Sequence, residues 1–70
     1  ARLGGIREDA PMGTIWQHVK SGYLYKITGH TIDESDLSPR ILYARVGGGT
    51  PIPWDRKADN FLDGRFVRQD

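Results

Sequence analysis

Cysteine is absent from this sequence of 70 residues, which excludes disulfides, cysteine-based zinc sites and cysteine-ligated iron–sulfur centres. Also missing is an apolar run near the ~18 residues of a membrane-spanning helix, and the first residues lack the apolar segment of a secretory signal peptide. Ten Lys and Arg against nine Asp and Glu leave a formal net charge of only +1, which by itself indicates neither a nucleic acid nor an anionic membrane as partner. We therefore expect a soluble protein of the cytoplasm.

The residues that are present favour β-structure. Nine Gly and four Pro interrupt the chain so often that no window is long enough for an ordinary globular helix. Its 37% hydrophobic residues, which include two Phe, two Trp and three Tyr, are too many for a disordered chain. A chain of this length buries only about 60% of the surface of its unfolded form, so we expect one domain with a small core.

Residues 1–12 mix charged and small residues around Gly4 and Gly5, and we expect them to form a flexible arm, with an edge strand over 3–7 as the alternative. The organised domain is expected over 13–70. Alternating side chains bounded by turn residues predict up to five strands, at 14–20, 23–28, 40–46, 50–56 and 65–68.

The connections follow from glycine, proline and the acidic residues. Gly22 suits a hairpin turn, and Gly29 is expected to close the second strand. The segment 30–39 is expected to be a solvated loop with Ile32 and Leu37 as apolar anchors, and 57–61 has room for one helical turn. The predicted fold is all-β, a small antiparallel sheet of four or five strands curled into an SH3-like half-open barrel.

Catalytic and metal chemistry find little support. His18, His30 and Asp33 are candidate metal ligands only if the fold brings them together, because no two histidines share a ligand-like spacing. Asp33, Glu34 and Asp36 are more consistent with a hydrated loop than with an acid–base pair. The Gly47-Gly48-Gly49-Thr50 stretch lacks the lysine of a phosphate-binding loop. We expect no enzyme, no cofactor and no metal; an oligomeric enzyme or small-ligand-binding protein is the remotest alternative.

Trp54 is the strongest candidate for a contact with a partner. It follows Pro51-Ile52-Pro53, whose prolines hold the backbone extended, and a large ring on such a segment loses little entropy on binding. The alternative is that Trp54 folds back as a lid on the small core. The expected function is non-catalytic binding of a protein partner, through five residues: Trp54, Arg56, Tyr23, Tyr43 and Arg45.

Single-stranded nucleic acid is the alternative partner. Small barrels stack bases on aromatic side chains beside cations, and Tyr23, Tyr25 and Lys26 supply both on one segment. The cationic excess is small for a surface that follows a polyanion, so this function ranks second.

Three blocks of the sequence carry a family resemblance. The first is Gly13-x-x-Trp16-x-His18-x-Lys20-x-Gly22-x-x-Tyr25-x-Ile27-x-Gly29, the second is Leu37-x-Pro39-x-x-x-Tyr43, and the third is Arg56-x-x-x-x-Phe61-x-x-Gly64-Arg65-Phe66. Together they resemble a family of small bacterial and phage proteins known as domain of unknown function 1653. Lys57 departs from the pattern, since the family usually has proline there. The resemblance implies a short β-barrel-like module of bacterial or phage origin, with no catalytic residues to transfer. A phage-encoded member would regulate or inhibit a host protein.

Overall fold

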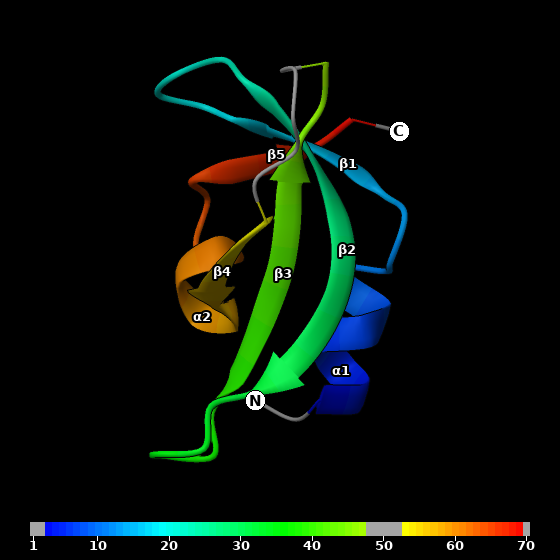
Figure 1. Ribbon diagram of the computed structural model, residues 1–70. Coiled ribbons are helices and arrows are strands. Elements are labelled where there is room, and N and C mark those ends of the chain that lie inside the picture. Colours follow the sequence, from blue (N-terminus) through cyan, green and yellow to red (C-terminus); the bar gives the residue numbers. More distant parts are fainter. Residues whose placement is uncertain (1–2, 48–52, 70) are drawn as a thin grey trace.

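The computed structural model describes residues 3–47 and 53–69, which form one antiparallel sheet and two short helices (Figure 1). The elements follow in the order α1 (Leu3–Asp9), β1 (Ile15–His18), β2 (Leu24–Ile32), β3 (Pro39–Arg45), β4 (Pro53–Lys57), α2 (Ala58–Phe61) and β5 (Phe66–Arg68). The predicted five-stranded antiparallel sheet and the helical turn over 57–61 are confirmed. The fold is mostly β rather than all-β.

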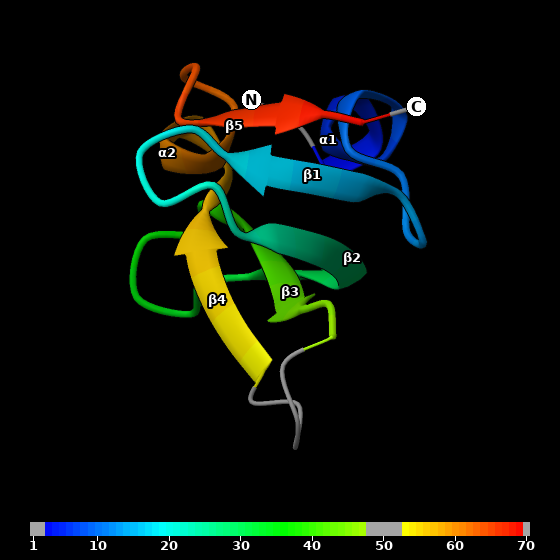
Figure 2. The ribbon, with the colours of Figure 1, turned by 90° about the horizontal axis from the view of Figure 1, so that it is seen from above.

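The strand order is β4-β3-β2-β1-β5, so the chain returns from one edge of the sheet to the other through α2. Figure 2 shows that the sheet is strongly curved, with β4 and β5 bending toward the same side. The two edge strands do not pair with each other, and the sheet is therefore open rather than closed into a barrel. Its concave face holds the core.

The N-terminal segment differs from the expected flexible arm. Residues 3–9 form α1, and Ile6 and Ala10 are buried in the core of the sheet. The Nε2–H of His30 donates a hydrogen bond of 2.6 Å to the carbonyl oxygen of Ala10, which fixes the end of the helix to β2. Residues 3–10 therefore do not form the flexible arm that we expected over 1–12. Ile6 and Ala10 are four positions apart, and this spacing places both apolar side chains on the side that faces the sheet.

Strand β2 is longer than predicted. It does not close at Gly29 but continues to Ile32, because Thr28 forms an irregularity between the pairs Ile27–Tyr43 and Gly29–Leu42. One extra residue on a strand reverses the alternation of its side chains. His30 consequently faces the same side of the sheet as Ile27, which is the side that α1 covers.

The turn between β2 and β3 is organised by its carboxylates and not by its apolar residues. Ile32 and Leu37, expected as anchors, are 47% and 76% exposed. Asp33 accepts hydrogen bonds from the backbone and hydroxyl of Ser35, and Asp36 does the same from Ser38. Ion pairs then fix the turn to the sheet: Asp33 binds Arg40 of β3 at 3.1 Å, and Asp36 binds Lys57 of β4 at 3.0 Å.

These contacts favour the charged form of both carboxyl groups. The hydroxyl of Ser35 is the main cause that lowers the pKa of Asp33. For Asp36, the hydroxyl of Ser38 and then the ammonium of Lys57 hold the pKa well below the ordinary value of 3.8. A carboxylate stabilised in this way favours the folded turn above its ordinary pKa, and the effect is lost as the pH falls through the lowered value.

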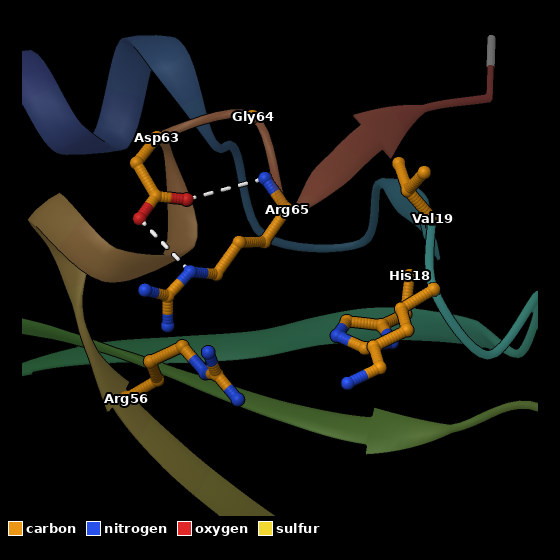
Figure 3. Close-up of a pocket in the computed structure, with 7 residues that line it drawn as sticks. His18, Val19, Arg56, Asp63, Gly64 and Arg65 are labelled. Carbon is orange, nitrogen blue, oxygen red and sulfur yellow. Dashed lines mark hydrogen bonds and ion pairs between the residues drawn. The ribbon is translucent and has the colours of Figure 1, made fainter.

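The last turn, between α2 and β5, is closed by Asp63. Its carboxylate accepts a hydrogen bond from the backbone of Arg65 at 3.1 Å and pairs with the Arg65 guanidinium at 3.1 Å (Figure 3). Gly64 between them has a φ of +105°, a conformation that a side chain would strain, so glycine suits this turn.

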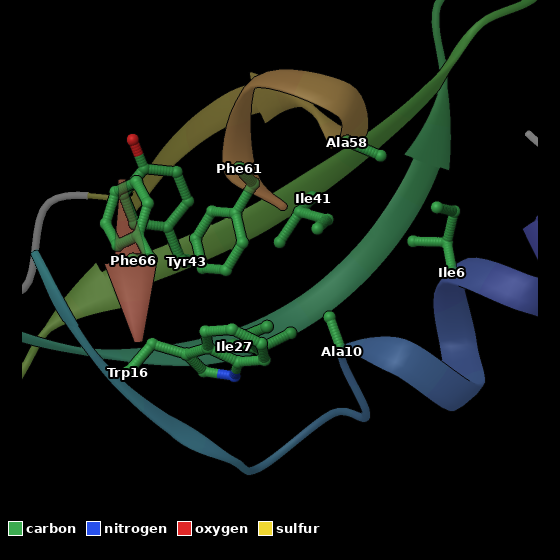
Figure 4. Packing of buried hydrophobic residues seen from close by; sticks show 9 residues of the cluster. All are labelled: Ile6, Ala10, Trp16, Ile27, Ile41, Tyr43, Ala58, Phe61 and Phe66. Carbon is green, nitrogen blue, oxygen red and sulfur yellow. The ribbon is translucent and has the colours of Figure 1, made fainter. Parts of the chain in front are cut away.

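The core fills the concave face of the sheet (Figure 4). Its buried members are Ile6, Ala10, Trp16, Ile27, Ile41, Tyr43, Ala58, Phe61 and Phe66. Phe61 of α2 lies flat on Phe66 of β5, with ring centroids 4.2 Å apart and an interplanar angle of 8°. The edge of Trp16 meets Phe61 at 5.3 Å. Helix α2 is thus held against both a central part of the sheet and its far edge.

The burial of Ile6 yields a test of the N-terminal helix. We expect Ile6→Ala to lower the free energy of unfolding by about 2–4 kcal/mol, because it removes a buried branched side chain and leaves a cavity. Glu8→Ala, on the exposed side of the same helix, is the control and should change it by less than about 0.5 kcal/mol. Urea unfolding measures both. Equal stability of the two variants would show that residues 3–10 do not pack on the sheet.

A second test concerns Asp36. A carboxyl-detected NMR titration should give Asp36 a midpoint below 3.8, and Ser38→Ala should move this midpoint upward, since the serine hydroxyl is the first cause of the lowering. Ser35→Ala is the matched control, because it acts on Asp33. An Asp36 midpoint that does not respond to Ser38→Ala would contradict the turn described above.

Candidate functional site

An open groove lies on the concave face, beyond the part that the helices cover. It has a volume of about 360 Å³, and we call it the aromatic groove. Every strand contributes to it. The lining residues are His18, Ser21, Tyr23, Tyr25, Tyr43, Trp54, Arg56 and Phe66. The groove therefore exists only when the whole sheet has formed.

The floor of the groove is a network of rings that continues into the core. The ring centroid of Tyr25 lies 5.4 Å from that of Tyr43, 5.6 Å from that of Trp54 and 5.8 Å from that of Phe66, and each pair meets edge to face. Phe66 in turn stacks on the buried Phe61. Because each ring is held by its neighbours, the floor loses little freedom when a ligand covers it.

Trp54 stands at the margin of this floor. It is opposite Tyr43 in the pairing of β3 and β4, and its ring packs against Tyr25 and Tyr43. It is nevertheless 39% exposed. Trp54 therefore packs on two tyrosines and also reaches solvent, and its role as a contact for a partner stays a prediction.

Arg56 lies two residues further along β4, on the same face as Trp54. It is half-buried, its Nε donates a hydrogen bond of 3.4 Å to the hydroxyl of Tyr43, and its guanidinium carbon lies 5.3 Å from the centre of the Phe66 ring. No carboxylate of the described residues pairs with it. Asp55, its neighbour, points to the opposite face and binds Arg40 at 3.2 Å.

Tyr23 and Arg45 form the rim. The guanidinium carbon of Arg45 lies 3.7 Å from the centre of the Tyr23 ring, and both side chains are exposed. The five residues expected to contact a partner are therefore brought together. Tyr43, 6% exposed, belongs to the floor, whereas Trp54 and Tyr23 offer the accessible surface.

The residues expected to bind nucleic acid are not assembled on one surface. Tyr25 pairs with Trp16 and points into the groove, whereas Lys26 pairs with Ile15 and Ala44 on the convex face. Successive residues of a strand point to opposite faces, so Tyr25 and Lys26 do not lie on a common face of the sheet.

The candidate metal ligands have separate roles. His18 Nδ1 contacts the hydroxyl of Ser21 at 2.9 Å, His30 binds the carbonyl of Ala10, and Asp33 binds Arg40. Within residues 3–47 and 53–69, no group of three or more histidine and carboxylate side chains is placed to hold a metal ion. In the same part of the chain, no helix is long and apolar enough to cross a membrane.

A second, larger recess adjoins the aromatic groove, with a volume of about 600 Å³. It is lined by His18, Val19, Lys20, Arg56, Asp63, Gly64 and Arg65 (Figure 3), and we call it the cationic recess. His18 and Arg56 line both the groove and the recess, so the two lie side by side.

Several of these lining residues could not be singled out from the sequence. His18 and Phe66 face each other because β1 pairs with β5, a contact between segments nearly fifty positions apart. Lys20 and Arg65 line the same recess for a related reason, since the backbone N–H of Val19 donates a hydrogen bond of 2.9 Å to the carbonyl oxygen of Arg65. For Phe66, the sequence indicates only that its side chain and that of Val67 point to opposite faces of a strand.

Comparisons of the chain with models of protein families, with curated proteins and with solved structures found no match. The resemblance to domain of unknown function 1653 stays a prediction.

Proposed function

We propose that this chain is a non-catalytic interaction module that binds a segment of a partner protein in the aromatic groove. The observation that carries the proposal is Trp54, whose indole is 39% exposed although it is packed against Tyr25 and Tyr43. An SH3-like topology of the curved sheet and a bacterial or phage origin belong to the same proposal, and they rest on the sequence.

The groove has the properties of a peptide-binding surface. Extended protein segments bind in grooves lined by aromatic rings, where flat, rigid side chains contact them at low cost in entropy. Trp, Tyr and Arg are also the residues that most often dominate the binding energy of protein interfaces. Trp54, Tyr23 and Arg56 provide all three types along one groove.

The polar groups of the groove support binding rather than catalysis. The Ser21 hydroxyl, which contacts His18, also accepts a hydrogen bond from the backbone of Tyr23 at 3.3 Å, so the pair closes the β1–β2 turn. A nucleophilic serine needs a base that is itself oriented by a third group. None of the described residues that line the groove is a carboxylate that could orient His18.

Single-stranded nucleic acid fits the groove less well. Base stacking needs an accessible ring face. Tyr43 is buried, and one face of Tyr23 is covered by Arg45. Lys26 lies on the other side of the sheet.

Replacement of Trp54 tests the proposal. Peptides selected from a random display library on the whole chain should bind Trp54→Ala at least about 30-fold more weakly by calorimetry, as expected for the loss of a central aromatic contact. Val67→Ala is the matched control, because Val67 is 50% exposed on the convex face. It should leave the affinity unchanged.

Two results would contradict the proposal. Unfolding of Trp54→Ala, seen by circular dichroism, would make Trp54 a core residue and not a contact residue. Selected peptides that bind Trp54→Ala as tightly as the unaltered chain would place the binding surface elsewhere.

A further inference from the structure

The cationic recess contains more positive than negative side chains. Lys20, Arg56 and Arg65 line it together with a single carboxylate, Asp63. Figure 3 shows the guanidinium groups of Arg56 and Arg65 on the same side of the recess, with His18 across from them. Asp63 pairs with Arg65 at 3.1 Å, and none of the described carboxylates forms an ion pair with Lys20 or Arg56.

This arrangement contrasts with two cations of β3 and β4 whose charges are paired. Arg40 binds both Asp33 and Asp55, and Lys57 binds Asp36. Arg56, on the same strand as Lys57, makes no ion pair within the described residues although it is half-buried. A partly desolvated guanidinium without an anion is unfavourable, and a carboxylate that supplies two parallel hydrogen bonds would relieve the cost.

We propose that the cationic recess binds the carboxylate of an Asp or Glu side chain of the partner segment. The proposal rests on the proposed function, because the same segment fills the aromatic groove. His18 and Arg56 line both sites, so one extended segment reaches both. The ligand class is therefore an extended peptide with an apolar or aromatic residue over Trp54 and an acidic residue beside Arg56.

The distribution of charge favours a protein ligand over a nucleic acid. Phosphates repeat along a nucleic acid strand and call for a row of cations that follows it. Here Lys20 and Arg56, which make no ion pair within the described residues, line the recess. Arg45 covers the Tyr23 ring at the rim, and Lys26 lies on the convex face. The cationic recess next to the aromatic groove therefore suits a peptide in which an acidic side chain lies near an apolar side chain.

The test uses peptides selected by display on the whole chain, each resynthesised with its Asp or Glu replaced by Asn or Gln. We expect acidic residues to be enriched at a fixed distance from an apolar residue. Removal of the acid should weaken binding at least about tenfold, as should Arg56→Gln. In a double-mutant cycle, Arg56→Gln should lower the affinity for the peptide without the acid much less, because the ion pair between the acid and Arg56 is already absent.

Two further variants separate a direct contact from a structural effect. Lys20 is exposed, so Lys20→Gln should leave the groove intact. It should lower the affinity only for the acidic peptides, by about twofold to fivefold. Arg7→Gln removes the same charge from the exposed side of α1 and is the matched control, with no expected change in affinity. Circular dichroism of each variant verifies that it is folded.

The outcomes distinguish this inference from the proposed function. Peptides that depend on Trp54 but show no acidic enrichment and no coupling to Arg56 would overturn the inference and leave the proposed function standing. Absence of any peptide that depends on Trp54 would overturn both. Tighter binding of short single-stranded oligonucleotides, with a steep salt dependence lost in Arg56→Gln, would overturn the assignment of a protein ligand.

Discussion

The stack of Phe61 on Phe66 is the contact on which the architecture depends. The concave face of an open sheet must be filled by side chains, and contacts must hold the sheet in its curved shape. The chain has no cysteine for a disulfide, and the described residues form no metal site that could do this. Helix α2 follows the edge strand β4 directly, and its Phe61 lies flat on Phe66 of the opposite edge strand, β5. One ring contact thereby brings both edges toward each other. The same contact supports Tyr25 and Tyr43 from below, so the curvature of the sheet and the shape of the aromatic groove have a common origin.

The strands were predictable because their signal is local. Alternating side chains and turn glycines located all five, although several of their ends differ from the prediction. Residues 50–52 of the fourth predicted strand lie outside the described residues. Helix α1 was missed because Gly4 and Gly5 weaken its intrinsic preference, and the burial of Ile6 against a distant part of the sheet outweighs that preference. The extension of β2 past Gly29 was missed because a bulge breaks the period from which a strand is recognised. An SH3-like topology stays a prediction.

The candidate site was predictable in its residues and not in its arrangement. Trp54, Arg56 and Tyr43 were chosen by type, and pairing of β3 with β4 brings them together. Lys26 was grouped with Tyr25 as a sequence neighbour, although a strand separates such neighbours by the thickness of the sheet. His18 and Arg65 entered the cationic recess only through the pairing of β1 with β5, which joins the two ends of the domain. Sequence alone carries no information on that register unless a short loop fixes it.

The contrast between the two tryptophans gives the protein a built-in optical readout. Trp16 is 7% exposed, and its indole N–H donates a hydrogen bond of 2.9 Å to the hydroxyl of Thr14. Trp54 is partly hydrated and belongs to the proposed binding surface. A hydrated indole emits at longer wavelength than a sheltered one, so the long-wavelength part of the emission follows Trp54, whereas the short-wavelength part follows Trp16 and the integrity of the fold. Occupancy and unfolding are thus distinguishable in an unlabelled sample, with a single spectrometer.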